Sequence, residues 1–271
     1  MKILVVTQQY WPETFRINEV VQSLRRAGCT VTVLSGQPNY PEGRIYEGYR
    51  ATGIGKQAHP DGYLIYRVPV VPRAAGGALR LAANYFSFVL TASIFGPWLV
   101  RGQKFDAIFV YGVSPVLQAI PAIVLKALKR AALILWVQDL WPQSLEATGY
   151  VRNATLLSAV GIVTGWIYRR CTLVLVQSRP FAAEVSSLAG AGVVVAYHPN
   201  PGELTLSDGR PRHPSGLAFG NGFNLVFAGN LGKAQALATL VEAARLVAHD
   251  TDIRIVVVGS GSRSGWLQDE I

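Results

Sequence analysis

The chain has 271 residues, half of them hydrophobic and only 15% charged, so long disordered segments are excluded and one large or two ordinary domains can form a core. Its formal charge of +9 favours an anionic partner, either a phosphorylated substrate or an anionic membrane surface. The sequence has no motif of a nucleic-acid-binding module and no long basic run, so nucleic acid is not an expected partner.

Short strand-like runs alternate with helical patterns along the first 200 residues. Strands are expected at residues 3–7, 30–35, 63–69, 107–111, 133–138, 173–177 and 193–196. Helices are expected at residues 15–27, 79–100, 115–130, 156–169 and 180–188. Residues 37–62, rich in Pro, Gly and Tyr, are expected to form a long loop. Apolar strands separated by helices predict an α/β fold with a doubly wound parallel sheet.

The segment 79–100 is apolar and long enough to cross a bilayer. However, Gly96 and Pro97 interrupt it, and four polar residues dilute it. We therefore expect a helix that packs on the sheet and turns one face toward lipid, rather than a membrane span.

The alternation stops at residues 198–222, a polar stretch with four prolines and five glycines, and restarts with a strand at 224–228, a helix at 234–248 and a strand at 253–258. This pattern predicts a Rossmann-like domain over residues 1–200, a linker over 201–222 and the start of a second Rossmann-like domain over 223–271. A lone β-α-β unit cannot cover both faces of a sheet, so the second domain is expected to be incomplete.

Ligands of open α/β sheets bind beyond the carboxyl ends of the strands, so the loops there are the candidate sites. The first loop, residues 7–18, places polar side chains just before a helix, where an anion can bind, although they can also serve only as caps and packing. Its candidate ligands are Gln9, Glu13, Arg16 and Asn18. The second loop, residues 36–43, presents Asn39 and Tyr40, and it is equally well explained as a rigid turn made by its two prolines.

A third loop follows the buried strand at 133–138. Asp139 is placed to orient a sugar hydroxyl or to take its proton, and Trp141 offers a ring face to a sugar. Gln138 lies beside them. The alternative is that Asp139 caps the next helix and Trp141 fills the core.

Two glycine-containing loops follow the strands of the second domain. The first contains Gly229, Asn230, Gly232 and Lys233. The second contains Gly259, Ser260 and Gly261. Small residues allow the backbone to approach a phosphate, and Lys233 adds a cation, although a plain glycine turn explains the same residues. The first loop lacks the spacing of a Walker motif, and the four histidines lack the spacing of a metal site.

Four segments in order carry a resemblance: TQQYWPETFRIN, PNYPEGRIYEGY, LWVQDLWPQS and FAGNLGKAQAL. Together they resemble the GT-B glycosyltransferases of family 4, within a bacterial O-antigen and exopolysaccharide branch that includes N-acetyl-L-fucosamine transferases. The resemblance implies two facing Rossmann-like domains, of which the N-terminal one binds the acceptor and the C-terminal one a nucleotide sugar. UDP is the expected nucleotide.

The same resemblance implies a retaining transfer without a metal or other cofactor, to a lipid-diphosphate-linked saccharide at the inner face of the bacterial inner membrane. Lys233 would neutralise the leaving diphosphate. Asn230 stands where relatives often carry Arg. Gln138 and Asp139 stand where many relatives place a His that contacts the transferred sugar.

The acidic, Glu-containing motif that grips the donor in this family is expected beyond Ile271, so the chain resembles a C-terminally truncated member and is expected to transfer sugar poorly. Two other functions remain open. One is a non-catalytic acceptor-domain fragment that docks on the membrane, and the other is an epimerase of nucleotide sugars, which shares the fold.

Overall fold

The structure is a computed structural model, and it describes residues 1–74, 77–147, 153–201, 222–232 and 235–271. The chain divides into two compact units. Unit 1 comprises Met1–Leu145 and Arg152–Asn200, and unit 2 comprises Glu146–Val151 and Pro201–Ile271. Most of the predicted linker, residues 202–221, lies outside the described residues.

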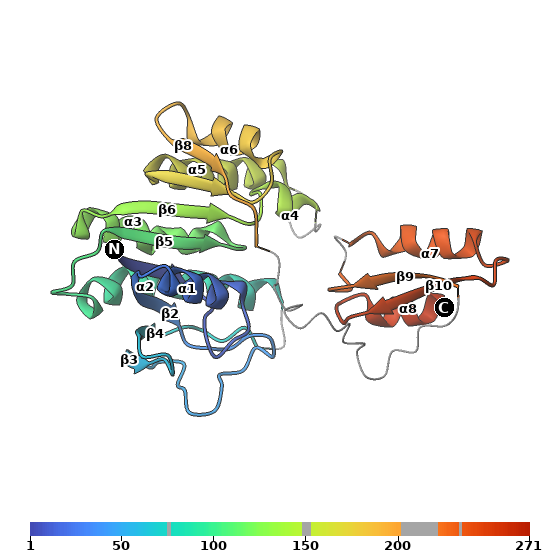
Figure 1. The fold of residues 1–271 in the computed structure, drawn as a ribbon, viewed down its shortest axis with the longest axis horizontal. Helices are drawn as coiled ribbons and strands as arrows, with labels where there is room; N and C mark the ends of the chain where they lie inside the picture. The colour runs from blue at the N-terminus through green and yellow to red at the C-terminus, as the bar shows by residue number, and fades with distance from the viewer. Residues whose placement is uncertain (75–76, 148–152, 202–221, 233–234) are drawn as a thin grey trace. The chain divides into compact units, whose positions relative to one another are not determined.

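Unit 1 is built on an eight-stranded sheet with the order β3-β4-β2-β1-β5-β6-β7-β8 (Figure 1). The strands are β1 (Lys2–Thr7), β2 (Thr30–Gly36), β3 (Gly55–Ala58), β4 (Leu64–Val68), β5 (Ala107–Gly112), β6 (Ala132–Val137), β7 (Leu173–Val176) and β8 (Val194–Tyr197). Every neighbouring pair is parallel except β3 with β4. The predicted α/β fold with a parallel sheet is confirmed.

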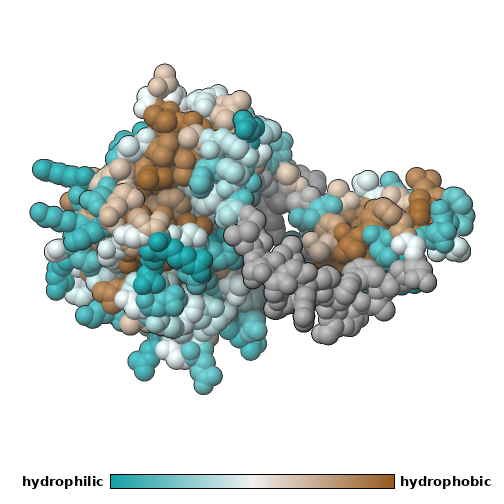
Figure 2. All heavy atoms as spheres, viewed as in Figure 1, coloured by the Kyte–Doolittle hydropathy of each residue, from teal (hydrophilic) through white to brown (hydrophobic). Residues whose placement is uncertain are grey.

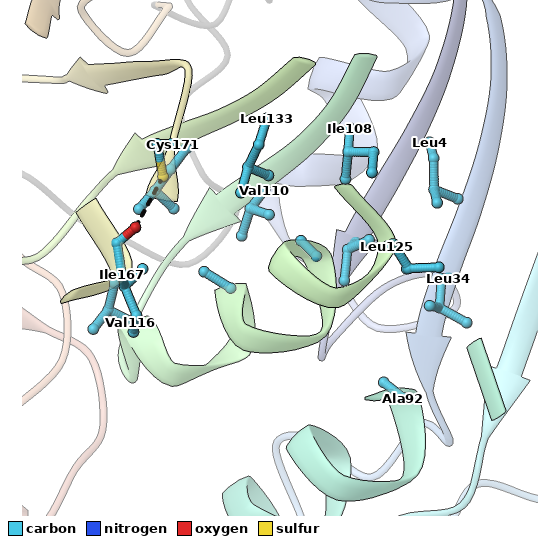
Figure 3. Packing of buried hydrophobic residues seen from close by; sticks show 14 of the residues in the cluster. Leu4, Leu34, Ala92, Ile108, Val110, Val116, Leu125, Leu133, Ile167 and Cys171 are labelled. Carbon is cyan, nitrogen blue, oxygen red and sulfur yellow. Dashed lines mark hydrogen bonds between the residues drawn. The ribbon is translucent and has the colours of Figure 1, made fainter. Parts of the chain in front are cut away.

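Helices cover both faces of the central strands, so every residue of β5 and every residue of β1 after Lys2 is buried. The helices of unit 1 are α1 (Arg16–Arg26), α2 (Ala78–Leu99), α3 (Ile120–Lys129), α5 (Ala154–Arg170) and α6 (Phe181–Ala189). The short helix α4 (Gln143–Ala147) begins at the end of the first segment of unit 1. One face of the sheet packs against α1, whereas α2, α3, α5 and α6 share the core of the other face. Figure 3 shows Leu4 and Ile108 from the strands, Leu125 from α3 and Ala92 from α2 in this second core.

The structure also differs from the prediction. The expected loop 37–62 contains β3, a short antiparallel edge strand. Its sequence, GKQA, has no apolar run from which a strand could be predicted. The helix expected at 115–130 begins as a 3-10 turn, η1 (Val116–Ala119), before α3. The helix expected at 79–100 packs on the sheet as predicted.

On the α1 side of the sheet, β7 and β8 keep part of their apolar surface exposed. The parallel register places Leu173 of β7 beside Val194 of β8, and Val194 is 64% exposed. Figure 2 shows apolar residues gathered over this part of unit 1. The sheet therefore leaves its β8 end less covered than its centre.

Unit 2 contains two parallel strands, β9 (Phe223–Ala228) and β10 (Ile253–Val258), with α7 (Leu237–Leu246) and α8 (Ser264–Glu270). The helix α8 was not predicted. Leu231, Leu237, Val241 and Leu267 form the buried core of this unit.

A buried carboxylate ties together the first two loops of unit 1. Glu13 is 1% exposed, and its Oε1 accepts hydrogen bonds from the backbone N–H groups of Asn39 and Tyr40, both at 2.8 Å. Its Oε2 accepts from the N–H of Tyr10 at 3.0 Å. Burial raises the pKa of Glu13, although the three N–H donors and the Arg67 guanidinium favour the ionised form.

The substitution Glu13→Gln should lower the free energy of unfolding by about 1–3 kcal/mol, because a buried N–H donor then faces an amide NH2 group. The folded-state pKa of Glu13 lies above its ordinary value. The folded protein therefore gains stability from the protonated carboxyl at a pH below the ordinary pKa, and this stabilisation is lost as the pH rises through the folded-state pKa. The deficit of the variant should therefore shrink with rising pH.

Urea denaturation of both proteins at a series of pH values measures this deficit. The matched control is Glu47→Gln, an exposed residue of the second loop region, which should change stability by less than about 0.5 kcal/mol. A deficit of Glu13→Gln that stays constant across the pH range would contradict the buried titration.

Candidate functional site

The candidate site of unit 1 lies at the carboxyl edge of its sheet. Because β1, β2, β5 and β6 are parallel neighbours, the loops that follow them meet at one edge. Direct bonds join these loops. The Asn39 N–H donates to Glu13 Oε1 at 2.8 Å, the Gln8 N–H donates to Gln118 Oε1 at 3.1 Å, and the Ser114 N–H donates to Asp139 Oδ2 at 3.0 Å. The sheet therefore brings the first three predicted loops together.

Asp139 is held by the neighbouring strand rather than by its own helix. Its Oδ2 accepts from the backbone N–H of Ser114 at 3.0 Å and from Ser114 Oγ at 2.9 Å. Ser114 Oγ in turn accepts from Trp141 Nε1 at 2.9 Å. These bonds fix Asp139 to the loop after β5, and Trp141, 8% exposed, belongs to the hydrophobic core as the alternative interpretation had it.

Gln138 lies at the same strand end and is 8% exposed. Its Oε1 accepts from Asn200 Nδ2 at 2.7 Å, and its carbonyl accepts from Gln177 Nε2 at 3.1 Å. Its Nε2 is buried and has no hydrogen-bond partner among the residues that the structure describes. A buried amide donor without a partner is costly, and a hydroxyl or phosphate oxygen of a ligand would satisfy it.

The charges of Arg16 and Asp139 both influence the pKa of Tyr111. Burial is the main cause that raises the pKa of Tyr111, while Arg16 lowers it and Asp139 raises it. Both charges are therefore close enough to Tyr111 to affect its hydroxyl, and the first and third loops share one electrostatic environment.

The other polar residues of the first loop maintain its shape. Asn18 donates from Nδ2 to the carbonyl of Glu13 at 2.8 Å and accepts from the N–H of Trp11 at 3.1 Å. Gln9 is 6% exposed, and its carbonyl accepts from Thr7 Oγ1 at 3.0 Å. The structure thus shows Glu13 and Asn18 as organisers of the loop, and any contact of theirs with a ligand stays a prediction.

The second loop gathers residues that the sequence did not single out. Asn39 Oδ1 accepts from the backbone N–H of Arg73 at 3.3 Å and from Asn84 Nδ2 at 3.4 Å. The Arg73 guanidinium lies 5.3 Å from the ring centre of Tyr40. Arg73 follows β4, and Asn84 lies in the first half of α2, so no local pattern relates either residue to Asn39.

In unit 2 the two glycine loops pack directly on each other. The N–H of Gly229 donates to the Val258 carbonyl at 2.9 Å, and the N–H of Leu231 donates to the Ser260 carbonyl at 2.8 Å. A Cβ added to Gly259 would lie 1.8 Å from the Gly229 carbonyl oxygen, so only glycine fits there.

Asn230 lies between the glycine turns, because a Cβ at Gly232 would meet its Nδ2 at 2.7 Å and one at Gly261 its Oδ1 at 2.7 Å. Ser260 belongs to the second turn. Lys233 lies outside the described residues, and α7 begins at Leu237, later than the predicted residue 234.

Within unit 1, the arrangement offers a carboxylate, a cation and a buried unpaired amide donor at one sheet edge. Such groups can orient hydroxyl groups, accept a proton and bind an anion. Within unit 2, the two glycine turns have no bulky side chains, so a ligand can approach their backbone closely.

The chain is similar to known proteins in sequence and in fold. The chain is 26% identical, over 99% of its length, to the putative colanic acid biosynthesis glycosyl transferase WcaI of Escherichia coli K12, and it covers 68% of that protein. It is similar in fold to HepE of Anabaena, solved with UDP and glucose, at a TM-score of 0.58 and 14% identity.

It is also similar in fold to the trehalose 6-phosphate synthase of Burkholderia multivorans, at a TM-score of 0.64 and 10% identity. The whole chain matches both structures, spanning 64% of HepE and 68% of the synthase. These likenesses confirm the GT-B fold. Residues 14–201 match the model of the glycosyl transferase 4-like domain, and the chain therefore belongs to that family.

Proposed function

We propose that the protein is a retaining glycosyltransferase. It moves a sugar from a UDP-linked donor to a lipid-diphosphate-linked saccharide in the synthesis of a bacterial cell-surface polysaccharide. The observation that carries the proposal is Asp139, fixed by two hydrogen bonds at the carboxyl edge of the sheet in a chain of this family.

The acceptor is assigned to unit 1. Asp139 Oδ2 is engaged by Ser114, so Oδ1 is the oxygen assigned to the acceptor hydroxyl. Gln138 Nε2 and the Arg16 guanidinium are assigned to sugar oxygens and to the acceptor diphosphate. Trp141 acts by positioning Ser114 rather than by stacking on the sugar.

The donor is assigned to the glycine loops of unit 2. HepE, which shares the fold, was solved with UDP-glucose, and that observation supports a UDP-linked donor here. Gly229, Gly259 and Gly261 let the backbone approach the diphosphate, and Lys233 supplies the positive charge. No metal is needed, because Lys233 and the backbone N–H groups stabilise the leaving group.

In the proposed reaction the bond between the anomeric carbon and the β-phosphate oxygen breaks, and its electron pair leaves with UDP. The acceptor hydroxyl oxygen bonds to the same face of that carbon, and its proton passes to Asp139. The name of WcaI supports exopolysaccharide synthesis, and the resemblance to N-acetyl-L-fucosamine transferases extends the proposal to O-antigen synthesis. The protein would act as a peripheral protein on the cytoplasmic face of the inner membrane.

A transfer assay with radiolabelled UDP-sugars and lipid-diphosphate-linked saccharides tests the proposal. Asp139→Asn should lower turnover by about 10²- to 10⁴-fold, because the amide cannot take the hydroxyl proton. The matched control is Asp106→Asn, an exposed aspartate whose Oδ2 bonds to the Lys2 N–H at the opposite edge of the sheet, and it should retain turnover. An equal loss of turnover in both variants would show that Asp139 has no specific role in the reaction.

Nucleotide binding tests the donor loops separately, by calorimetry with UDP. Gly259→Ala should abolish binding, because the new Cβ collides with the Gly229 carbonyl and forces the loops apart. The control Gly265→Ala lies in α8 with nothing within 4 Å of the added Cβ, and it should bind UDP normally. If the wild-type chain bound membranes but neither UDP nor any UDP-sugar, the non-catalytic docking function would be favoured instead.

A further inference from the structure

The outward side of α2 is a stripe of large apolar side chains. Phe86, Leu90, Ile94 and Trp98 recur every fourth residue and are 56–61% exposed. Residues at this spacing lie on one side of a helix. On the opposite side, Phe88 and Ala92 are completely buried against the sheet. The stripe is thus surface that the core of unit 1 does not use.

The neighbouring helices extend this apolar surface. The helices α2 and α3 pack side by side, and α3 contacts α5. On α3, Leu128 is 62% exposed, and on α5, Ile162 is 67% exposed. We call the exposed side chains of these three helices the outer layer.

The charges of the outer layer have one sign. The helices α2, α3 and α5 contain no Asp or Glu, whereas α1 and α6 each contain a Glu. Because the three helices lead into β5, β6 and β7, their C-terminal ends all lie at the amino edge of the sheet. The cations near these ends are Arg101, Lys104, Lys126, Lys129, Arg130, Arg169 and Arg170.

Two further features suit a lipid headgroup. A hollow of about 550 Å³ at this edge is open to solvent, and four cations, Lys126, Arg130, Arg169 and Arg170, line it. Trp98 and Trp166 each lie beneath a guanidinium, at 4.8 Å from Arg101 and 5.1 Å from Arg170. Tryptophan next to a cation is typical of the interface between membrane and water.

We propose that the outer layer docks on the surface of a bilayer that contains anionic phospholipid. The apolar stripe enters the acyl boundary, and the cationic edge binds the phosphates. By length and composition, Leu79–Leu99 could also span a membrane. Surface docking is favoured because one side of α2 is part of the core, and because Asn84 in the first half of the helix is buried and bonded to Gln8 and Val71.

This surface lies next to the candidate site. The helix α2 begins at the carboxyl edge, where Asn84 Oδ1 accepts from Gln8 Nε2 at 2.7 Å, and it ends at the cationic edge. Phe86, the first residue of the stripe, follows Asn84 by two positions. A docked outer layer would therefore hold the site beside the membrane, which suits an acceptor carried on a lipid. The proposal rests on the proposed function in this respect.

Sedimentation with vesicles tests the docking without any sugar donor, so its failure is distinct from a failure of transfer. The wild-type chain should bind vesicles of phosphatidylcholine with phosphatidylglycerol and bind pure phosphatidylcholine weakly. The triple variant Phe86→Ser, Leu90→Ser, Ile94→Ser should bind the anionic vesicles at least about tenfold more weakly. Its control is Leu246→Ser, which removes a still more exposed apolar side chain (76%) from α7 and should leave binding normal.

The charge contribution is tested by Arg101→Gln with Arg170→Gln, which should weaken binding about tenfold or more at low salt. Arg26→Gln with Arg44→Gln removes the same charge from exposed positions outside the outer layer and should have little effect. Circular dichroism and thermal melting confirm that each variant is folded.

Four results would overturn the proposal. Equal vesicle binding by the triple variant and the wild type would show that the apolar stripe does not contribute to docking. Equal binding to neutral and anionic vesicles would show that docking does not require anionic lipid. A wild-type dimer that the triple variant dissociates, without vesicle binding, would assign the surface to a second copy of the chain. Resistance of membrane-bound protein to carbonate extraction would indicate a span instead.

Discussion

A carboxylate with almost no access to water holds the ligand edge of the sheet in place. Backbone N–H groups from two separate loops donate to the carboxylate oxygens of Glu13. Among the described contacts, no charged side chain bonds to these oxygens. Removing a carboxylate from water is costly, and the three donors offset only part of that cost, because the pKa of Glu13 stays raised. The loop geometry and the ionised carboxylate therefore depend on each other, and the positions of Asn39 and Tyr40 follow from Glu13.

Arg67 supports the same edge from the adjacent strand. It is 3% exposed and donates to the carbonyls of Gly36 and Trp11, and its positive charge favours the ionised form of Glu13. Burial lowers the pKa of Arg67, since desolvation disfavours its charged form. Two buried groups of opposite charge thus organise loops whose polar side chains face the candidate site.

The fold followed from the sequence where the signal was local. The central runs of β1 and β5 are apolar on both faces, and this pattern is typical of parallel strands covered by helices. The edge strand β3 has no such pattern, because its pairing depends on β4 and not on its own burial. Asp139 could be nominated from its place after a strand, whereas its partner Ser114 could not, since 25 residues separate them.

Asn84 determines which side of α2 faces outward. An apolar helix packed on an apolar sheet can turn about its axis at little cost, because one aliphatic side chain replaces another. A fully buried amide removes that freedom, since any rotation would break its bonds to Gln8 and Val71 and leave polar atoms without partners. One asparagine thereby sets the rotational register of the entire helix, much as a single buried polar residue sets the register of a coiled coil.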